Sequence, residues 1–308
     1  MNIKSNLSKQ NIQEFSGYST DNHMKCIRVS GNDAAEFLQG QFSNDINEIT
    51  DSSFQISSFS TNQGKVISII RIFKDTNGFI ILINDQMSLY FIKKLSMYIL
   101  RSDVSISMLE DYKIFAGIGN DIKKIIDFKK IDKKRNYLQE KDYFILNNSS
   151  DDLTSVIIVS FSKNNVTVLK MLEDHNIPIL NYNVFLFADI MNKIVRLNSD
   201  TMEKYIPQVL NVDSLDGINF KKGCYTGQEI VARTHYLGKI KKKIFLIKHD
   251  SKNIRINDKV NNNDDESSGE IISENILVDE KIFCLAILKI SSINEILVSK
   301  GIPLEVVY

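Results

Sequence analysis

Short runs of β-branched and aromatic residues, separated by polar turns, dominate the hydrophobic pattern of the chain. Two of these runs, at 65–73 and 79–83, flank the Asn-Gly pair at 77–78. Asn-Gly between such runs favours a tight hairpin turn, so the two runs are predicted to form antiparallel strands. In 86–100 apolar residues recur at helical spacing instead, which predicts a helix with Asp85 as its N-cap.

A shorter helix is predicted close to the beginning of the chain. The apolar run 26–29 is typical of a strand and leads directly into residues 31–41. Asp33 followed by Glu36 resembles a capping box, and Gly40 provides an ending for the helix. We therefore expect a short helix within 31–41.

The middle of the chain has the order of strands and helices found in a ferredoxin-like α+β unit. Its predicted elements are a strand at 113–119, a helix from about 121, strands at 144–146 and 156–161, and a helix near 165–175. A further helix is expected at roughly 181–194, after this unit.

Beyond about residue 238 the pattern consists of short strands alone. The β-rich runs lie at 244–247, 270–272, 282–290, 295–298 and 304–308. Such spacing predicts a small antiparallel barrel or sandwich. The polar run 261–270 fits a solvated hairpin loop rather than a metal site.

Composition places the chain among ordinary globular proteins. Its 308 residues are 43% hydrophobic and 25% charged, and the length allows two or three domains of about 100–150 residues each. Lys plus Arg and Asp plus Glu each total 38, a balance that disfavours a protein coating nucleic acid or an anionic membrane. No apolar run approaches the roughly 20 residues of a membrane helix, and the amino terminus lacks the apolar segment of a secretion signal.

The cysteines and histidines exclude several kinds of site. The three cysteines are widely spaced without a C-x-x-C pair, which excludes a zinc ribbon and disfavours a disulfide framework. No H-x-x-x-H or H-E-x-x-H pair exists, so no metal site is predicted. A reducing, cytoplasmic location is the simplest expectation.

Residues 220–239, FKKGCYTGQEIVARTHYLGK, carry the clearest chemical signal. Thr226 and Glu229 have the spacing of a capping box before an apolar run, which predicts a helix with Thr226 as its N-cap. Cys224 would then lie two residues before this cap. Unpaired backbone N–H groups and the positive end of the helix dipole favour a thiolate there. The sequence therefore predicts an activated cysteine.

Neighbouring residues support this interpretation. Lys221 and Lys222 precede Cys224, and Gly223 allows a sharp turn or the close approach of a ligand. Arg233 would add positive charge if the helix folds back. The alternative is a buried, unreactive thiol, because free cysteine is among the most buried residue types.

A cysteine hydrolase with His235 as its base is disfavoured. Cys224 and His235 are eleven positions apart with a helix between them, or about 16 Å along the helix axis at 1.5 Å per residue. Cys26 and Cys284 lie inside apolar, strand-like runs, and a structural role is expected for both.

The segment around Cys224 resembles the signature K-G-C-Y-x-G-Q-E of the YgfZ family, folate-binding proteins related to the glycine-cleavage aminomethyltransferase, or T-protein. Three other segments resemble further blocks of that family, in family order. They are VSGNDAAEFLQGQFSND at 29–45, STNQGKV at 60–66 and YIPQVLNVD at 205–213. The resemblance covers nearly the whole chain, and the cysteine signature is its most specific part.

The resemblance implies an α+β fold of three domains arranged in a ring. These would be a split folate-binding domain at 1–110 and 180–237, a ferredoxin-like domain at 111–179, and an antiparallel β-barrel at 238–308. It also implies tetrahydrofolate as the cofactor and a role in the synthesis or repair of iron–sulfur enzymes, including those that modify tRNA. The family's functional cysteine corresponds to Cys224.

Four residues are the expected folate contacts. Met24 and Phe185 occupy the positions at which family members often place tryptophans, and both side chains can pack on a flat ring. Lys222 and Arg233 belong to the cysteine segment and complete the set. Binding is expected to be weakened, because Met191 stands where the family has a glutamate that hydrogen-bonds the pterin edge.

The loss of that glutamate has a predictable cost. A buried hydrogen-bond partner contributes about 1–3 kcal/mol, or roughly 5–150-fold in affinity. Asp189 is the candidate substitute if the register shifts. The sequence also differs from the T-protein at 65–69. The T-protein has an acid in this stretch that assists aminomethyl transfer, whereas 65–69 contains no carboxylate.

The sequence therefore predicts a folate-binding accessory protein that supports iron–sulfur enzymes and, through them, tRNA modification. The alternative is a folate-dependent one-carbon transferase acting on an unknown acceptor. The expected partners are folate and transiently bound client enzymes, with a monomeric chain and no membrane. Direct tRNA binding is not expected, because the basic stretches 129–135 and 238–243 lack interleaved aromatic residues and are typical of solvated faces.

Overall fold

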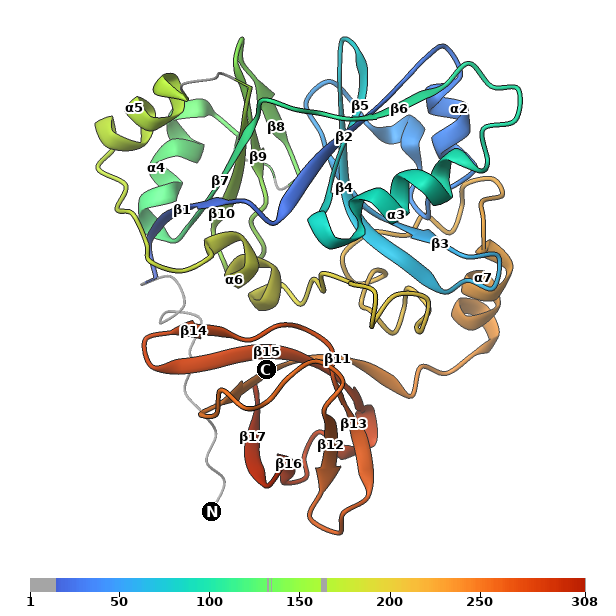
Figure 1. Cartoon of the computed structure of the whole chain (residues 1–308), viewed down its shortest axis with the longest axis vertical. Coiled ribbons are helices and arrows are strands. Elements are labelled where there is room, and N and C mark those ends of the chain that lie inside the picture. The colour runs from blue at the N-terminus through green and yellow to red at the C-terminus, as the bar shows by residue number, and fades with distance from the viewer. Residues whose placement is uncertain (1–14, 132, 134, 162–164, 308) are drawn as a thin grey trace.

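The computed structural model describes residues 15–131, 133, 135–161 and 165–307. The amino-terminal segment used to argue against a secretion signal lies outside these residues, except for Phe15. Two residues of the basic stretch 129–135 also lie outside them. Within the described part, two α+β units stand side by side above a β-barrel (Figure 1).

The first unit is a five-stranded antiparallel sheet with the strand order β3-β4-β5-β2-β6. Its strands are β2 (Met24–Ser30), β3 (Gln55–Ser60), β4 (Val66–Asp75), β5 (Gly78–Asn84) and β6 (Ser105–Met108). The Asn-Gly hairpin prediction is confirmed, because β4 and β5 pair as far as Asp75 and Gly78.

Two helices cover one face of this sheet, α2 (Ala34–Gln39) and α3 (Asp85–Ser96), with the short 3-10 helix η1 (Ile46–Glu48) beside α2. Phe37, Phe91 and Leu95 bury their side chains against strand residues in a shared core. Both predicted helices are confirmed, with small corrections at their starts. The N-cap of α3 is Asn84 rather than Asp85, and Asp33 makes no side-chain capping bond to α2, since its carboxylate accepts from the Asp103 N–H instead.

The second unit is an antiparallel sheet with the order β1-β7-β10-β9-β8. Its strands are β1 (Gly17–Asp21), β7 (Lys113–Ile118), β8 (Tyr137–Gln139), β9 (Tyr143–Asn147) and β10 (Ser155–Ser160). Helices α4 (Asn120–Lys129) and α5 (Val166–Asp174) contribute to a common core with these strands.

This order is that of a ferredoxin-like sheet, with one difference from the sequence prediction. The edge strand next to β7 is β1, which comes from the beginning of the chain rather than from 111–179. Residues 111–179 contain the other four strands of the sheet. The fifth, β1, joins them by pairing with β7, which lies about a hundred residues later in the chain. The domain boundaries themselves stay a prediction.

The third unit is a closed antiparallel barrel. Its strands follow the order β11-β17-β16-β12-β13-β15, and pairing of β11 with β15 closes the circle, while β14 adds to the edge of β15. The strands are β11 (Lys242–His249), β12 (Lys259–Asn262), β13 (Ser267–Ile271), β14 (Ile276–Val278), β15 (Lys281–Lys289), β16 (Leu297–Ser299) and β17 (Ile302–Val307), with the 3-10 helix η2 (Ile290–Ser292) after β15. The predicted barrel is confirmed.

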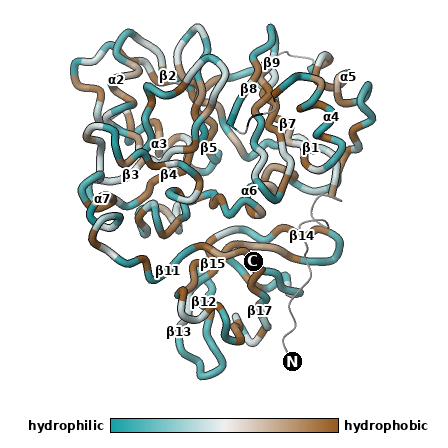
Figure 2. The backbone as a smooth tube through the Cα atoms, turned by 180° about the vertical axis from the view of Figure 1, so that it is seen from behind, coloured by the Kyte–Doolittle hydropathy of each residue, from teal (hydrophilic) through white to brown (hydrophobic). Residues whose placement is uncertain are grey.

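The three units meet at helix α6 (Val184–Met191) and the irregular chain that follows it (Figure 1). Phe187 illustrates this junction, since its ring contacts Phe15 and Tyr182 on one side and Phe283 of the barrel on the other. Hydrophobic segments follow the strands of all three units (Figure 2), and one core cluster contains residues of each. No helix in the described part of the chain is long and apolar enough to cross a membrane.

Candidate functional site

Cys224 lies in an irregular loop just before helix α7 (Gln228–Leu237). The N-cap of α7 is Gly227, with a left-handed φ of 83° and no side-chain capping bond. The predicted capping box is therefore wrong by one residue. The Thr226 hydroxyl donates to Gln41 Oε1 at 3.0 Å, and its backbone N–H donates to the Gly40 carbonyl at 3.1 Å. These bonds hold Thr226 against residues 40–41. Its hydroxyl is therefore not available to cap the helix, and Gly227 becomes the N-cap residue.

Close packing explains why that residue is a glycine. A Cβ atom added to Gly227 would lie 2.5 Å from the Thr61 carbonyl oxygen and 2.9 Å from the Gly64 Cα atom. Gly64 also has a positive φ, of 70°. The two glycines thus bring the turn at 61–65 into direct contact with the start of α7.

Lys222 fixes the loop from the opposite side. Its ammonium group donates to the carbonyl oxygens of Gln39, Phe42 and Asn44 at 2.7, 2.8 and 2.8 Å. The side chain is 7% exposed, and burial lowers its pKa to about 8. The ammonium also lies 5.1 Å from the centre of the Tyr225 ring. In this structure Lys222 therefore binds protein carbonyls, which is a different contact from the folate contact expected for it.

A third segment, 208–211, supports α7 from the inside. The side-chain amide of Gln208 donates to the Val231 carbonyl at 2.7 Å, and Asn211 donates similarly to Ile244 at the start of the barrel. The residues that hold the cysteine loop and α7 thus come from 39–44, 61–64 and 208–211. These are the same blocks that carry the family resemblance, although their contact in space could not be predicted from the sequence.

Cys224 itself is exposed. A Cβ atom added to the preceding Gly223 would meet no atom within 4 Å, so the space beside the thiol is open. This placement contradicts the alternative of a buried, unreactive thiol. Cys26 and Cys284 are buried, and burial raises the pKa of both thiols, that of Cys284 to about 12.

The charged and aromatic residues of α7 point to solvent. Arg233, one of the expected folate contacts, is exposed on the surface of α7 and is not part of a closed pocket. The ring of His235 stacks on Phe220, with centroids 3.7 Å apart. Within the described residues no hydrogen bond joins His235 to Cys224.

The predicted folate contacts Met24 and Phe185 are both buried. Phe185 has no exposed surface, and the guanidinium groups of Arg71 and Arg196 lie 5.1 and 4.7 Å from the centre of its ring. The ring therefore has no free face for a ligand. Met24 is 4% exposed and borders an open cavity of about 470 Å³ beside β6 and β7.

Asp189 is fully committed to a buried ion-pair network. Its two carboxylate oxygens accept from Arg71 Nη2 and, at 2.8 Å, from Arg196 Nε, and Arg196 also lies 3.4 Å from Asp21. The side chain of Asp189 is 1% exposed. A register shift that brings Asp189 to a ligand is therefore excluded by its own partners.

Met191, by contrast, borders a cavity of about 240 Å³ between the second unit and the irregular chain that follows α6. Arg135 and Lys193 border the same cavity, and neither forms an ion pair with a described residue. Burial and, to a smaller extent, the nearby charge of Arg71 lower the pKa of the Arg135 guanidinium to about 10. The group still carries its charge at neutral pH. It can therefore pair with an anionic group of a ligand that packs against Met191, although Asp151 and Asp152 also border the cavity.

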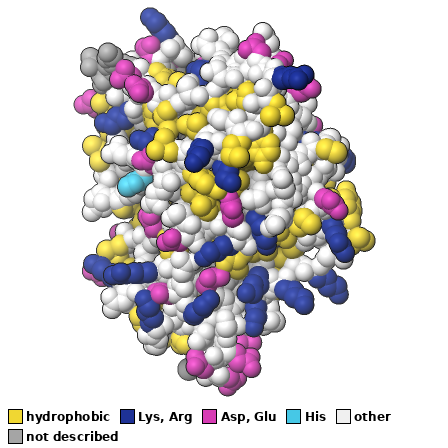
Figure 3. Space-filling model, turned by 45° about the vertical axis from the view of Figure 1, so that its right-hand side comes forward, with side chains coloured by type: hydrophobic (Ala, Val, Ile, Leu, Met, Phe, Trp, Pro, Cys, Tyr) yellow, Lys and Arg dark blue, Asp and Glu magenta, His cyan; other side chains and the backbone are white. Residues whose placement is uncertain are grey.

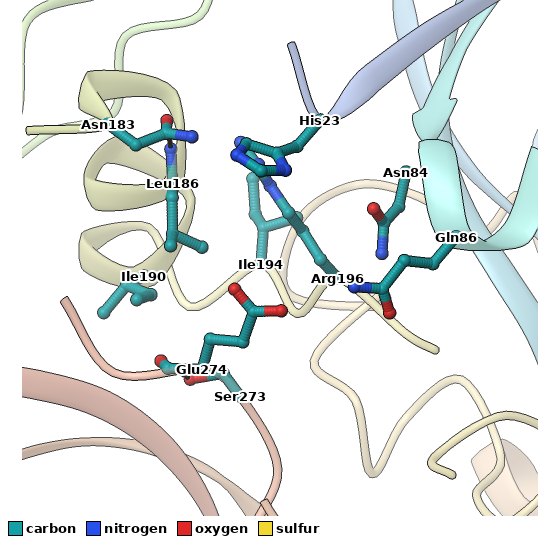
Figure 4. Close-up of a pocket in the computed structure, with 10 residues that line it drawn as sticks. All are labelled: His23, Asn84, Gln86, Asn183, Leu186, Ile190, Ile194, Arg196, Ser273 and Glu274. Atoms are coloured by element: carbon teal, nitrogen blue, oxygen red, sulfur yellow. Dashed lines mark hydrogen bonds between the residues drawn. The ribbon is translucent and has the colours of Figure 1, made fainter. Parts of the chain in front are cut away.

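A second cavity, of about 110 Å³, lies on the other side of α6, where all three units meet (Figure 4). His23, Asn84, Asn183 and Arg196 border it, and the Glu274 carboxylate points into it from the barrel. Ile194 borders both cavities. No group of three or more His, Cys, Asp or Glu side chains in the described ranges is arranged to hold a metal ion.

Comparisons with known proteins agree with this geometry. No family model matches the chain. It is 30% identical to the tRNA-modifying protein YgfZ of Buchnera aphidicola subsp. Baizongia pistaciae over 213 residues, which are 68% of this chain and 66% of that protein. It is 28% identical to the protein of the same name from Colwellia psychrerythraea, over 72% of this chain and 68% of the relative. The chain thus spans about two thirds of the length of these curated relatives.

A solved structure supports the fold. The glycine cleavage system aminomethyltransferase T from Bartonella henselae matches with a TM-score of 0.74, covering 97% of this chain and 87% of that one. The sequence identity is 14%, so this likeness concerns the fold alone. The predicted T-protein-like arrangement is confirmed.

Proposed function

Because the chain belongs to the YgfZ family, whose curated relatives are named tRNA-modifying proteins, we propose that it functions in tRNA modification. The finer role follows the resemblance noted in the sequence. The protein would bind tetrahydrofolate and support the synthesis or repair of the iron–sulfur enzymes that modify tRNA. Cys224 would be the residue that contacts those client enzymes.

One observation carries this proposal. An exposed thiol occupies a loop whose backbone is bound on three sides, by Lys222, Thr226 and the Gly64–Gly227 contact. A loop with an ordinary connecting role needs no such support, whereas a reactive side chain needs a fixed position to meet its partner productively. The open space beside Gly223 leaves room for a protein partner to reach the sulfur.

The cavity beside Met191 offers tetrahydrofolate a cation with which its carboxylate can pair, and this contact can be tested. Arg135 supplies a half-buried cation without an ion-pair partner among the described residues, and a glutamate carboxylate of the cofactor would pair with it. Met191 would pack against the flat part of the molecule. When bound, tetrahydrofolate supplies a carrier for one-carbon units. The residues of this chain bind and orient it, and the Cys224 loop is separate from the cavity lining.

The cysteine role is tested by measuring modified nucleosides. A bacterial strain that lacks its own family member is supplied with this chain or with Cys224→Ala, and the thiolated nucleosides of its tRNA are quantified by mass spectrometry. Cys224→Ala should lower them to the level of the empty strain while leaving the free energy of unfolding within about 0.5 kcal/mol, because the side chain is exposed. Lys252→Ala, an exposed barrel residue outside the cysteine loop, is the control and should retain full activity. Full nucleoside levels with Cys224→Ala would remove the proposed role of the thiol.

The folate role is tested by calorimetric titration with two ligands. Tetrahydrofolate carries carboxylates, and 6-methyltetrahydropterin carries none. We expect Arg135→Gln to weaken tetrahydrofolate about 10-fold or more, as loss of a charged hydrogen bond does, and to leave 6-methyltetrahydropterin unchanged. Equal weakening of both ligands would mean that Arg135 supports the fold of the cavity. No binding of either ligand to the unaltered protein at millimolar concentration would remove folate from the proposal.

A further inference from the structure

The surface formed by 219–243 carries a concentrated positive charge. This segment contains seven Lys or Arg residues and one acidic residue, Glu229, whereas the rest of the chain has more acidic than basic residues. Lys222 is buried against carbonyl groups, and Lys243 lies 3.7 Å from Asp213. The five remaining cations are exposed, and none of them forms an ion pair with a described residue. They are Lys221, Arg233, Lys239, Lys241 and Lys242, which together with the aromatic residues beside them are called the α7 surface here.

The α7 surface also contains an exposed aromatic cluster. His235 stacks face to face on Phe220 with an angle of 17° between the rings. Tyr236 lies edge-on to His235, with centroids 4.8 Å apart, and is 66% exposed. Leu237 next to it is 82% exposed. Large rings are normally covered, so a ring cluster this accessible is a feature that needs a ligand or partner.

The combination could not be seen along the chain. Phe220 is separated from His235 by fifteen positions, and the linear basic stretch 238–243 contains no aromatic residue. The fold brings these parts together because α7 runs back along the loop that contains Phe220. In the space-filling view, Lys and Arg side chains gather on this side of the molecule, above the acidic end of the barrel (Figure 3).

We propose that the α7 surface binds RNA directly, through phosphate contacts from its lysines and arginine and through stacking of unpaired bases on Tyr236 and His235. Exposed cations alone would suit any anionic partner. Proteins that bind single-stranded nucleic acid combine exposed aromatic rings with nearby cations. The rings stack on the bases, and the cations contact the phosphates. An acidic protein surface would leave the aromatic cluster without a matching group.

Cys224 lies in the loop that adjoins the α7 surface, which links RNA binding to the proposed role of the thiol. The thiol lies in the loop between Phe220 and the start of α7, so RNA that extends along α7 from the aromatic cluster would reach this loop. The choice of tRNA as the RNA rests on the proposed function. The binding itself does not require a reactive cysteine, and this allows the two ideas to be tested separately.

Binding is measured by fluorescence anisotropy with the full chain carrying Cys224→Ser. The probes are a labelled tRNA transcript, its isolated anticodon stem–loop and inorganic polyphosphate of comparable charge. We expect both RNAs to bind in low salt, and the affinity to fall steeply as salt is added. Polyphosphate should bind more weakly, because it has no bases.

Two variants separate phosphate contacts from stacking. Replacing Lys239, Lys241 and Lys242 together by Gln should reduce the slope of log affinity against log salt by about 2. Tyr236→Ala should weaken the stem–loop about 5- to 100-fold without changing that slope. The matched control replaces three exposed barrel lysines by Gln, at the same cost in charge, and should bind RNA as the parent does. These control lysines are Lys252, Lys259 and Lys281.

Each outcome decides for or against the proposal. No RNA binding in low salt overturns it, even if Cys224-dependent tRNA modification is intact in the strain described above. RNA binding that the control lysine variant weakens as much as the α7 variant does also overturns it. Binding that is equal for polyphosphate and unaffected by Tyr236→Ala overturns base stacking and identifies the α7 surface as a general polyanion site. If binding holds while Cys224→Ala leaves nucleosides unchanged, only the proposed function fails.

Discussion

Replacing Lys222 by Met is the most informative perturbation of the cysteine loop. Methionine matches the length and apolar stem of lysine, so the change removes the ammonium with little change in packing. In the native protein this ammonium donates to three carbonyl groups of 39–44 and is 7% exposed. Its loss should therefore loosen the contact between the loop and the first unit.

The size of the effect follows from two opposing contributions. A buried carbonyl that loses its hydrogen-bond donor costs about 1–3 kcal/mol, and three are affected here. The variant also no longer buries a charged group. The fall in the pKa of Lys222 from 10.5 to about 8 corresponds to about 3 kcal/mol of that desolvation cost. We expect a net decrease of about 3 kcal/mol in the free energy of unfolding at pH 7.

The pH dependence gives a second, independent readout. Below about pH 8 the lysine is protonated in both the folded and the unfolded chain. Between about pH 8 and 10.5 only the unfolded chain holds this proton, so the contribution of Lys222 to stability rises with pH in that window. The difference in stability between the native chain and Lys222→Met should therefore widen by about 2–3 kcal/mol from pH 7 to pH 10.

Urea unfolding followed by circular dichroism at pH 7, 8, 9 and 10 measures both effects. The control is Lys221→Met, which changes the exposed neighbouring lysine and should alter stability by no more than about 0.5 kcal/mol at any of these pH values. If the two variants unfold alike at pH 7 and their curves remain parallel up to pH 10, the ammonium does not hold the loop.

Two further changes test the packing around the site. Gly227→Ala forces a side chain into a left-handed residue and against the Thr61 carbonyl oxygen, so it should cost about 2–3 kcal/mol of unfolding free energy, whereas Gly223→Ala should be neutral. Equal urea midpoints for these two alanine variants would contradict the close contact. Asp189→Asn should cost about 3–5 kcal/mol, because it leaves the guanidinium group of Arg71 buried without a carboxylate, while Arg196 keeps only Asp21. A loss below about 1 kcal/mol in the same assay would show that this network is not needed for stability.

The elements set by local pattern were predicted well, and those set by distant pairing were not. The hairpin at 66–84 and helices α2 and α3 have turn and capping residues within a few positions of each other, so the sequence reveals them. Strand β1 has a short, mixed sequence, and its place in the second sheet comes from pairing with β7, about a hundred residues later. No local period contains that information.

The candidate site shows the same division. Cys224 could be singled out because its neighbours have a recognisable spacing, but the N-cap was misplaced because Thr226 bonds to Gly40 and Gln41 rather than to its own helix. Phe185 was chosen as a ring that stacks on a ligand. Two buried cations that pair with Asp189 cover it instead, and nothing in the local sequence identifies such partners.

The cysteine loop and the Met191 cavity are held by different residues, and this bears on how they work together. The groups that bind the loop, from 39–44, 61–64 and Gln208, do not border the cavity that contains Arg135. A ligand in that cavity therefore has no direct contact through which to displace Cys224. The loop is held by protein groups that do not border the cavity, so these groups present the sulfur independently of the proposed folate site. The cysteine and the proposed folate site are joined by a common core rather than by a shared surface.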